Sequence, residues 1–216
     1  MVGSRLSNSL LDQLDLVGST ALRWDPERSL LEVARLIGAS VMDHRYLVPR
    51  DRTSASPQTL SAEHGLGAFP WHTDGATWTT PPRFIIMRSI GETRTPTAWL
   101  DGRAAMNGAA FDQHLRTGTW LVKGRIPFYT SAIDSTTSSI RFNPDVMSPA
   151  SPQARLAHTS LANVLHSAPA LMHHWTVGEV LVFDNHRILH ARPAVRHDDE
   201  RRLERVLCGS PVGMGF

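Results

Sequence analysis

Three strand-like segments most constrain what this chain of 216 residues can fold into. Residues 83–90, RFIIMRSI, are short, rich in β-branched side chains and bounded by Pro and Gly, which predicts a β-strand. Residues 178–195, GEVLVFDNHRILHARPAV, and residues 201–209, RRLERVLCG, are also strand-like and are separated by the polar turn RHDDE. Short strands joined by loops, with few helices, favour a β-sandwich or barrel with helices outside it.

Helices are expected in three places. Residues 27–38, ERSLLEVARLIG, carry apolar residues at helical spacing and end at a glycine. Residues 104–115, AAMNGAAFDQHL, are predicted to form a second helix, although Gly108 weakens the pattern. A third helix is predicted over residues 153–166.

The composition is that of an ordinary globular protein with 41% hydrophobic and 19% charged residues. A chain of this length is long enough for one core and short for two, so we expect a single domain over residues 1–216. Residues 49–69 and 130–153 are predicted to be loops because they lack a helical or strand-like pattern.

Charge and cysteine content exclude several classes of protein. The formal net charge is +2, and acids interleave with the arginines of VRHDDERRLERV, which disfavours a nucleic-acid-binding stripe. A single cysteine, Cys208, excludes an internal disulfide framework. No stretch is apolar enough for a membrane span, and the start lacks a secretory layout, so we expect a cytoplasmic protein.

His72 and Asp74, within FPWHTDGATWTTPP (69–82), are candidate metal ligands. An extended backbone points residues i and i+2 to the same side, so one imidazole and one carboxylate could reach a single ion. The best candidate for a third ligand is His190, while His186 is a rival because it shares strand parity with His190. Two histidines and one carboxylate with open positions form the facial triad of non-haem Fe(II) oxygenases.

Two arginines follow the last candidate ligand in the sequence. On a strand, Arg201, Leu203 and Arg205 would share one face. Two guanidinium groups on one face can bind an anion, and a guanidinium suits a carboxylate through paired hydrogen bonds. The alternative is a solvated, charged strand paired with the nearby acids.

These motifs resemble the TauD/TfdA group of Fe(II)- and 2-oxoglutarate-dependent dioxygenases, including its clavaminate-synthase-like branch. The resemblance spans about residues 69–207, and its most specific part is an HxD followed by PP and then FDNxRxLHxR. It implies a mainly β protein with flanking helices and a double-stranded β-helix (jelly-roll) core. The matching segments, in the family's order, are WHTDGATWTTPPRF, TAWLDGRAAM, WTVGEVLVFDNHRILHAR and ERRLERV.

The resemblance makes His72, Asp74 and His190 the ligands of Fe(II). It implies that 2-oxoglutarate and O₂ are consumed, that 2-oxoglutarate is decarboxylated to succinate and CO₂, and that a C–H bond of a small-molecule substrate is oxidised. Hydroxylation, desaturation and cyclisation are all compatible with this chemistry. Halogenation is disfavoured because halogenases of this fold replace the carboxylate ligand with a small residue, whereas Asp74 is present.

The resemblance also assigns the residues that bind 2-oxoglutarate. Arg201 would hold its distal carboxylate, and Thr97, from the family's T-x-W, would hydrogen-bond the same group. Arg205 would lie nearer the iron, against the keto-acid end of 2-oxoglutarate or an anionic group of the substrate. The family commonly has glycines and an acidic residue directly before this threonine, whereas here the stretch that ends at Thr97 is GETRTPT, so the loop is expected to differ there.

The substrate is not fixed by the sequence. A natural-product intermediate or an amino-acid-like acid is the expected class, and a homo-oligomer is possible. Arginines, aromatics and an asparagine near the predicted pocket are candidate substrate-binding residues: Trp71, Phe128, Tyr129, Arg141, Asn143 and Arg192.

Two alternative functions remain open from the sequence. The same triad could bind zinc in a metal-dependent hydrolase, which would need a nearby general base to activate water. A non-catalytic jelly-roll that only binds small acids is the other alternative.

Overall fold

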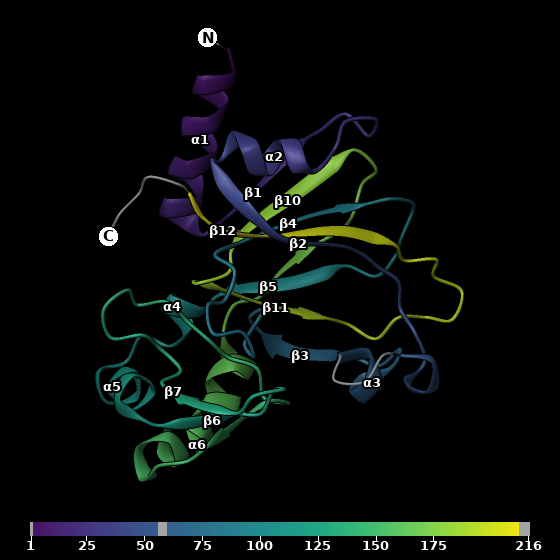
Figure 1. Cartoon of the computed structure of the whole chain (residues 1–216). Coiled ribbons are helices and arrows are strands. Elements are labelled where there is room, and N and C mark those ends of the chain that lie inside the picture. Colours follow the sequence, from purple (N-terminus) through teal and green to yellow (C-terminus); the bar gives the residue numbers. More distant parts are fainter. Residues whose placement is uncertain (1, 56–59, 212–216) are drawn as a thin grey trace.

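Three antiparallel sheets make up most of this computed structural model, which describes residues 2–55 and 60–211 (Figure 1). The five-stranded sheet contains, in spatial order, β1 (Ser19–Arg23), β10 (Glu179–Asp184), β4 (Phe84–Ser89), β12 (Leu203–Pro211) and β2 (Ala39–Leu47). The four-stranded sheet contains β3 (Phe69–His72), β11 (Ile188–Arg192), β5 (Thr97–Asp101) and β9 (Leu171–His173). The three-stranded sheet contains β7 (Phe128–Thr130), β6 (Trp120–Val122) and β8 (Met147–Pro149).

Helices lie on the outer sides of the two larger sheets. Figure 1 shows α1 and α2 beside the five-stranded sheet, and α5, α6 and the three-stranded sheet at the opposite end of the molecule. The helical elements are α1 (Val2–Val17), α2 (Leu31–Leu36), the 3₁₀ turn η1 (Arg52–Ser54), α3 (Leu60–His64), α4 (Gly102–Ala105), α5 (Ala109–Thr117) and α6 (Pro152–Ser167). None of the described helices is both long and apolar enough to cross a membrane.

The central strands of the five-stranded sheet are buried on both faces. On β4, Phe84 and Ile86 pack in the core beneath α1 and α2, while Ile85 and Met87 pack in the core shared with the second sheet. Alternate residues of a strand point to opposite faces, so burial on both sides requires the continuous apolar run seen in RFIIMRSI. The two larger sheets therefore face each other across a common core, which agrees with the predicted β-sandwich.

Strand β12 places one charged residue among the apolar residues of this inner core. Leu203 and Leu207 are buried between the two sheets, and Arg205, which has the same parity, lies on the same face of the strand. Val206 and Cys208 instead pack in the core beneath α1 and α2. The alternation of side chains along β12 thus directs the Arg205 side chain into the space between the sheets.

The strand predictions agree closely with the structure. Residues 83–90 contain β4, and residues 201–209 contain most of β12. Residues 178–195 form two strands, β10 and β11, joined by a turn at 185–187 that carries the chain from one sheet to the other. The predicted helix 153–166 corresponds to α6.

Two helix predictions and two loop predictions need correction. The helix predicted over 27–38 is confined to α2, because the Ser29 hydroxyl accepts a hydrogen bond from the Leu31 amide and holds the preceding residues in a turn. The helix predicted over 104–115 is two helices, α4 and α5, separated at the extended residue Gly108 (φ −162°). The predicted loop 49–69 contains η1 and α3, whereas residues 56–59 lie outside the described residues, and the predicted loop 130–153 contains β8.

Candidate metal centre

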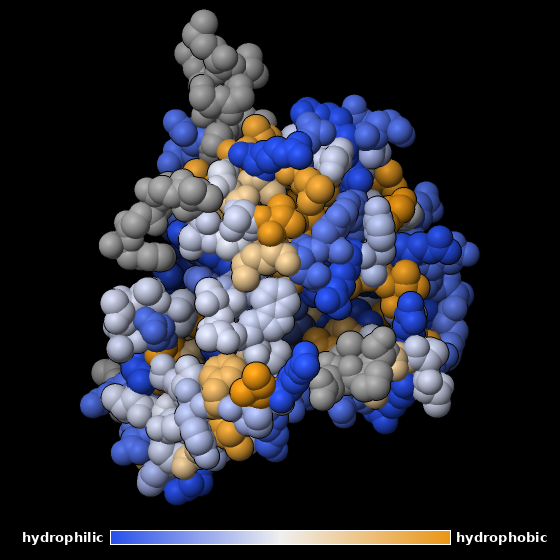
Figure 2. All heavy atoms as spheres, in the orientation of Figure 1, coloured by the Kyte–Doolittle hydropathy of each residue, from blue (hydrophilic) through white to orange (hydrophobic). Residues whose placement is uncertain are grey.

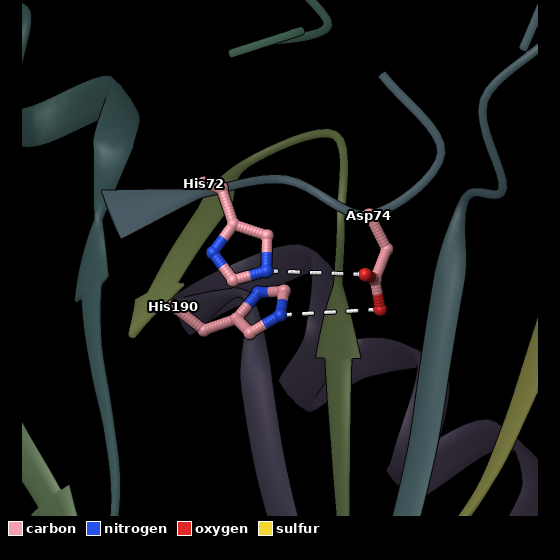
Figure 3. Close-up of side chains that lie close together, drawn as sticks. All are labelled: His72, Asp74 and His190. Carbon is pink, nitrogen blue, oxygen red and sulfur yellow. Dashed lines mark ion pairs between the residues drawn. The ribbon is translucent and has the colours of Figure 1, made fainter. Parts of the chain in front are cut away.

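The side chains of His72, Asp74 and His190 converge on one point between the sheets (Figure 3). His72 ends β3, Asp74 lies in the loop two residues later, and His190 lies on β11 directly opposite His72 in the strand pairing. The extended backbone of β3 and the antiparallel register of β3 with β11 therefore bring together residues that are more than one hundred positions apart. Their ligand atoms all lie within 4.8 Å of one another.

The three residues fit a single metal ion. The Nε2 atom of His72 lies 3.9 Å from Asp74 Oδ1, and the Nε2 atom of His190 lies 3.9 Å from Asp74 Oδ2. These distances are too long for hydrogen bonds, whereas two ligand atoms that each lie about 2.1 Å from one ion can be up to about 4.2 Å apart. Figure 3 shows both imidazole rings turned towards the Asp74 carboxylate. Two imidazoles and one carboxylate suit Fe(II) as well as zinc.

Both imidazoles are held in the neutral form that binds metals. Burial lowers the pKa of His72, and burial together with the His72 ring lowers the pKa of His190 to about 3. The Nδ1 atom of His72 lies 2.8 Å from the Pro70 carbonyl oxygen, to which it donates its hydrogen. The lone pair of a neutral His72 is therefore on Nε2, the atom that faces Asp74.

Asp74 supplies the negative charge of the site. Burial alone would raise the pKa of its carboxyl group, but the surrounding charge, of which the Arg205 guanidinium is the largest contributor, lowers it. The NH1 group of Arg205 donates a hydrogen bond to Asp74 Oδ2 over 2.9 Å. The carboxylate is thus ionised and fixed in orientation before any metal binds.

Asn185 is a positioning residue that sequence reasoning missed. It lies in the turn between β10 and β11, and its side-chain oxygen accepts a hydrogen bond from the Asp74 amide over 2.8 Å. Its side-chain nitrogen donates to the carbonyl oxygens of Asp74 (3.0 Å) and Pro82 (2.8 Å). One buried amide therefore ties the loop after β3 to the turn that precedes His190. The turn-forming pair DN is the sequence signal that could have identified it.

Gly75 makes the sharp turn after Asp74 possible. It has a φ of +69°, and a Cβ atom there would lie 2.5 Å from the Pro82 side chain. Gly75→Ala is expected to destabilise the protein by about 1–3 kcal/mol and to weaken metal binding, because the loop must move Asp74 to relieve the clash. Urea unfolding and metal titration measure both effects. Gly91→Ala is the matched control, because its Cβ would meet no atom within 4 Å, and an equal loss in both variants would contradict this explanation.

Acidification is expected to destabilise the metal-free protein. His190 has a folded-state pKa of about 3, below its ordinary value of 6.5, so the unfolded chain binds the extra proton as the pH falls below 6.5. Stability that is present above pH 6.5 is therefore lost progressively towards pH 3, by about 2 kcal/mol for His190 alone between pH 7.5 and 5. Urea unfolding at these two pH values measures the loss, and His190→Gln should reduce it. An unfolding free energy that does not fall at pH 5 would contradict the prediction.

Thr97 and Arg201 lie together in the same cavity as the triad. The cavity has a volume of about 490 Å³, and its lining includes His72, Asp74 and His190. The NH2 group of Arg201 donates to the Thr97 hydroxyl over 3.0 Å, and its NH1 group donates to the Thr95 carbonyl.

The Arg201–Thr97 pair has the character of an anion-binding site. Arg201 is buried, which lowers its pKa to about 10 and leaves it charged at neutral pH. Among the described residues, no carboxylate forms an ion pair with its guanidinium. The Thr97 hydroxyl oxygen also accepts a hydrogen bond from Trp175 Nε1 over 3.1 Å, so its own hydrogen remains free to donate to an anion.

Hydrogen bonds to Asp199 hold the loop before Thr97 in place. The Asp199 carboxylate accepts hydrogen bonds from the hydroxyls of Thr93 and Thr95 and from the Thr95 amide. Two threonines of GETRTPT thus bind an acid from a distant segment of the chain.

Most of the predicted substrate-binding residues do not line this cavity, although Arg192 does. Tyr129 is 67% exposed, and Trp71 and Phe128 pack against the core beside α5 and α6. The side chains of the other two form local contacts: Arg141 donates to the carbonyls of Ala76, Trp78 and Thr79, and Asn143 accepts from the Asp145 amide. Arg141 therefore supports the loop that follows Asp74.

His186, the rival to His190, lies outside the triad. It occupies the turn between β10 and β11, and its Nε2 atom lies 3.4 Å from the Pro81 carbonyl oxygen. The turn breaks the strand parity on which the rival assignment depended. The described residues thus bring together the preferred triad instead.

Solved structures of non-haem iron oxygenases have the same fold. An asparagine oxygenase in complex with Fe(II), 2S,3S-3-hydroxyasparagine and succinate is 15% identical, with a TM-score of 0.74, and the match covers 94% of this chain and 78% of that chain. The oxygenase OrfP in complex with Fe and alpha-ketoglutaric acid is 19% identical, with a TM-score of 0.75 and coverage of 97% and 80%. PvcB from Pseudomonas aeruginosa is 19% identical, with a TM-score of 0.70 and coverage of 95% and 81%. These likenesses confirm the predicted jelly-roll fold.

A family model confirms the resemblance seen in the motifs. The model described as "Taurine catabolism dioxygenase TauD, TfdA family" matches residues 108–207. This range contains His190, Arg201 and Arg205, while His72 and Asp74 precede it and join His190 only in the folded structure. No curated protein matches the chain. With this match and this fold, the chain resembles the TauD/TfdA dioxygenases over residues 108–207 and shares the fold of non-haem iron oxygenases.

Proposed function

We propose that this protein is an Fe(II)- and 2-oxoglutarate-dependent oxygenase. It couples the decarboxylation of 2-oxoglutarate to succinate and CO₂ with the oxidation of a C–H bond in a small-molecule acid. The observation that carries the proposal is one cavity that contains both the His72–Asp74–His190 triad and the buried Arg201–Thr97 pair. A metal triad alone would suit several chemistries, whereas the added anion site suits a co-substrate with a distal carboxylate.

Each residue of the site has a separate task in this proposal. His72, Asp74 and His190 would hold Fe(II), which supplies the activation of O₂ when bound. Arg201 and Thr97 would bind the distal carboxylate of 2-oxoglutarate. Arg205 keeps Asp74 ionised and oriented through its hydrogen bond to Oδ2.

Apolar residues line part of the site. Met87 and Leu203, on the five-stranded sheet, line the cavity on the side that faces the triad.

A substrate of amino-acid size is consistent with the cavity. Its volume of about 490 Å³ lies within the range of small-molecule sites. The solved structures with this fold include complexes with 3-hydroxyasparagine and (3S)-hydroxy-L-Arg, which supports a small polar acid as the substrate class.

The zinc hydrolase reading has less support from the cavity. Such an enzyme needs a general base close to the metal-bound water. Among the described residues that line the cavity, Asp74 is the one carboxylate, and it is paired with Arg205. The described lining of the cavity therefore offers no second acid to act as that base.

Succinate formation tests the proposed reaction without knowledge of the substrate. Purified protein with Fe(II), 2-oxoglutarate and O₂ is expected to form succinate slowly, because 2-oxoglutarate can be consumed without a second substrate. Omission of any one component, or replacement of Fe(II) by Zn(II), should abolish succinate formation. Protein that binds Fe(II) and 2-oxoglutarate but forms no succinate with any of a panel of organic acids would contradict the proposal.

A further inference from the structure

The cavity around the triad carries far more positive than negative charge. Within the described part of the chain, five arginines line it, against the single carboxylate of Asp74: Arg45, Arg50, Arg192, Arg201 and Arg205. Residues 56–59, SPQT, lie between lining residues in the sequence and contain no acid. Such an excess of cations in a partly enclosed space favours anionic ligands.

Pairing within the protein and with 2-oxoglutarate accounts for three of these arginines. Arg205 contacts Asp74, and Arg45 contacts Asp43 over 2.9 Å. Under the proposed function, Arg201 is occupied by the distal carboxylate of 2-oxoglutarate. Arg192 and Arg50 have no carboxylate partner among the described residues.

Arg192 is placed to bind an anion beside the metal site. It follows His190 by two residues on β11, and the shared parity directs both side chains to the same face of the strand. The residue is only 8% exposed. Its Nε atom is buried and has no hydrogen-bond partner among the described residues.

The neighbours of Arg192 fix its position but leave its charge unmatched. The NH2 group donates to the carbonyl oxygens of Gly65 (2.8 Å) and Gly67 (2.6 Å), and the guanidinium carbon lies 3.6 Å from the centroid of the Phe69 ring. Carbonyls and an aromatic face hold a guanidinium rigidly without neutralising it. A buried cation with an unused donor is costly unless a ligand completes it.

We propose that Arg192 forms a second anion subsite, which receives the acidic group of the substrate while Arg201 holds 2-oxoglutarate. The substrate class is then a small organic acid that presents a carboxylate, sulfonate or phosphate. Arg50, which is exposed and also lines the cavity, adds positive charge at its mouth. This assignment rests on the proposed function, because it takes Arg201 as the 2-oxoglutarate site.

Sulfate is a suitable probe of this subsite because it offers only charge and oxygen atoms. Protein loaded without oxygen with Fe(II) and saturating 2-oxoglutarate is titrated with sodium sulfate at constant ionic strength, and binding is followed by thermal shift and calorimetry. We expect one saturable sulfate site in the wild type, and Arg192→Gln should weaken it at least about tenfold. Arg50→Gln should weaken it about threefold, because a more distant charge is lost.

The remaining variants separate binding from folding and from co-substrate binding. Arg192→Lys keeps the charge and should retain sulfate binding better than Arg192→Gln, although both lose the paired contacts to Gly65 and Gly67. Arg155→Gln, on the exposed side of α6, should bind sulfate as the wild type does. The affinity for 2-oxoglutarate, measured separately, should change less than about threefold in Arg192→Gln.

Three results would overturn the assignment. The first is a wild type that binds 2-oxoglutarate but not sulfate, and the second is equal sulfate affinity in the wild type and Arg192→Gln. The third is loss of 2-oxoglutarate binding in Arg192→Gln, which would place Arg192 in the co-substrate site. A wild type that binds neither Fe(II) nor 2-oxoglutarate would instead refute the proposed function itself.

Discussion

Asp74→Ala is expected to abolish tight Fe(II) binding and to lower succinate formation at least about 100-fold. The carboxylate is the one negative charge among the three ligands, and it faces both imidazoles at 3.9 Å. Its loss would also remove the nearer of the two carboxylates beside Arg205, since Asp74 lies 2.9 Å and Asp43 lies 3.9 Å from its guanidinium. Fe(II) titration without oxygen and a succinate assay measure the two effects.

Two further substitutions show whether the effect of Asp74→Ala comes from the loss of a metal ligand. Asp74→Asn keeps an oxygen that can accept from Arg205, so it separates the loss of charge from a loss of stability. Asp12→Ala, on the exposed side of α1, removes a carboxylate far from the cavity and should leave both measurements unchanged. Wild-type iron affinity in Asp74→Ala would exclude this residue as a ligand.

Arg201→Gln is expected to raise the KM for 2-oxoglutarate about 100-fold. Removing one partner of a buried, hydrogen-bonded charge pair costs about 2–5 kcal/mol, and about 2.7 kcal/mol corresponds to a factor of 100. Arg201→Lys should restore little of this loss, because an ammonium group cannot reproduce the paired hydrogen bonds of a guanidinium. Steady-state kinetics with varied 2-oxoglutarate measure the change.

The neighbouring arginine provides the control for Arg201. Arg202 is exposed, whereas Arg201 is buried beside Thr97. Arg202→Gln should therefore leave the KM for 2-oxoglutarate unchanged, while Thr97→Val should raise it through the loss of the hydroxyl donor. Similar effects at positions 201 and 202 would point to general electrostatics rather than to a defined carboxylate site.

The grouping of His72, Asp74 and His190 could be predicted because local patterns encode their positions. The spacing of His72 and Asp74 needs only an extended backbone, and the strand-like run around His190 places it on a buried face. Leu203 and Arg205 share one face of β12 because alternate residues of a strand point to the same side. What the sequence could not give is the pairing of β3 with β11, since antiparallel register depends on contacts between distant segments.

Elements with weak local patterns were missed. Helix α1 buries Leu10 and Leu14 against α2 and the five-stranded sheet, so tertiary packing stabilises it more than its own composition does. Strand β2 lies at the edge of its sheet and is exposed along most of its length, which removes the alternation of apolar and polar residues that identifies a strand. Figure 2, in the orientation of Figure 1, shows hydrophilic and hydrophobic residues mixed over the face of the molecule that is turned to the viewer.

The supporting residues of the site were also hidden from the sequence. Asn185 holds the Asp74 loop through hydrogen bonds to backbone groups, and Arg141 holds the following carbonyls. When a side chain bonds to a distant backbone group, the residue type at the partner position can vary. The sequence at that position therefore does not reveal the contact. Arg141 was a candidate substrate-binding residue because its guanidinium suits a carboxylate, and in the structure that guanidinium donates to the backbone carbonyls of Ala76, Trp78 and Thr79.

The most direct test of the account is the absorption spectrum of the protein with Fe(II) and 2-oxoglutarate in the absence of oxygen. If the triad and the Arg201–Thr97 pair form one site, addition of 2-oxoglutarate to the Fe(II)-loaded protein should produce a weak visible charge-transfer band. The band should be absent in Asp74→Ala and should need far more 2-oxoglutarate in Arg201→Gln. Protein that binds Fe(II) with the expected stoichiometry but develops no band at saturating 2-oxoglutarate would contradict the assignment.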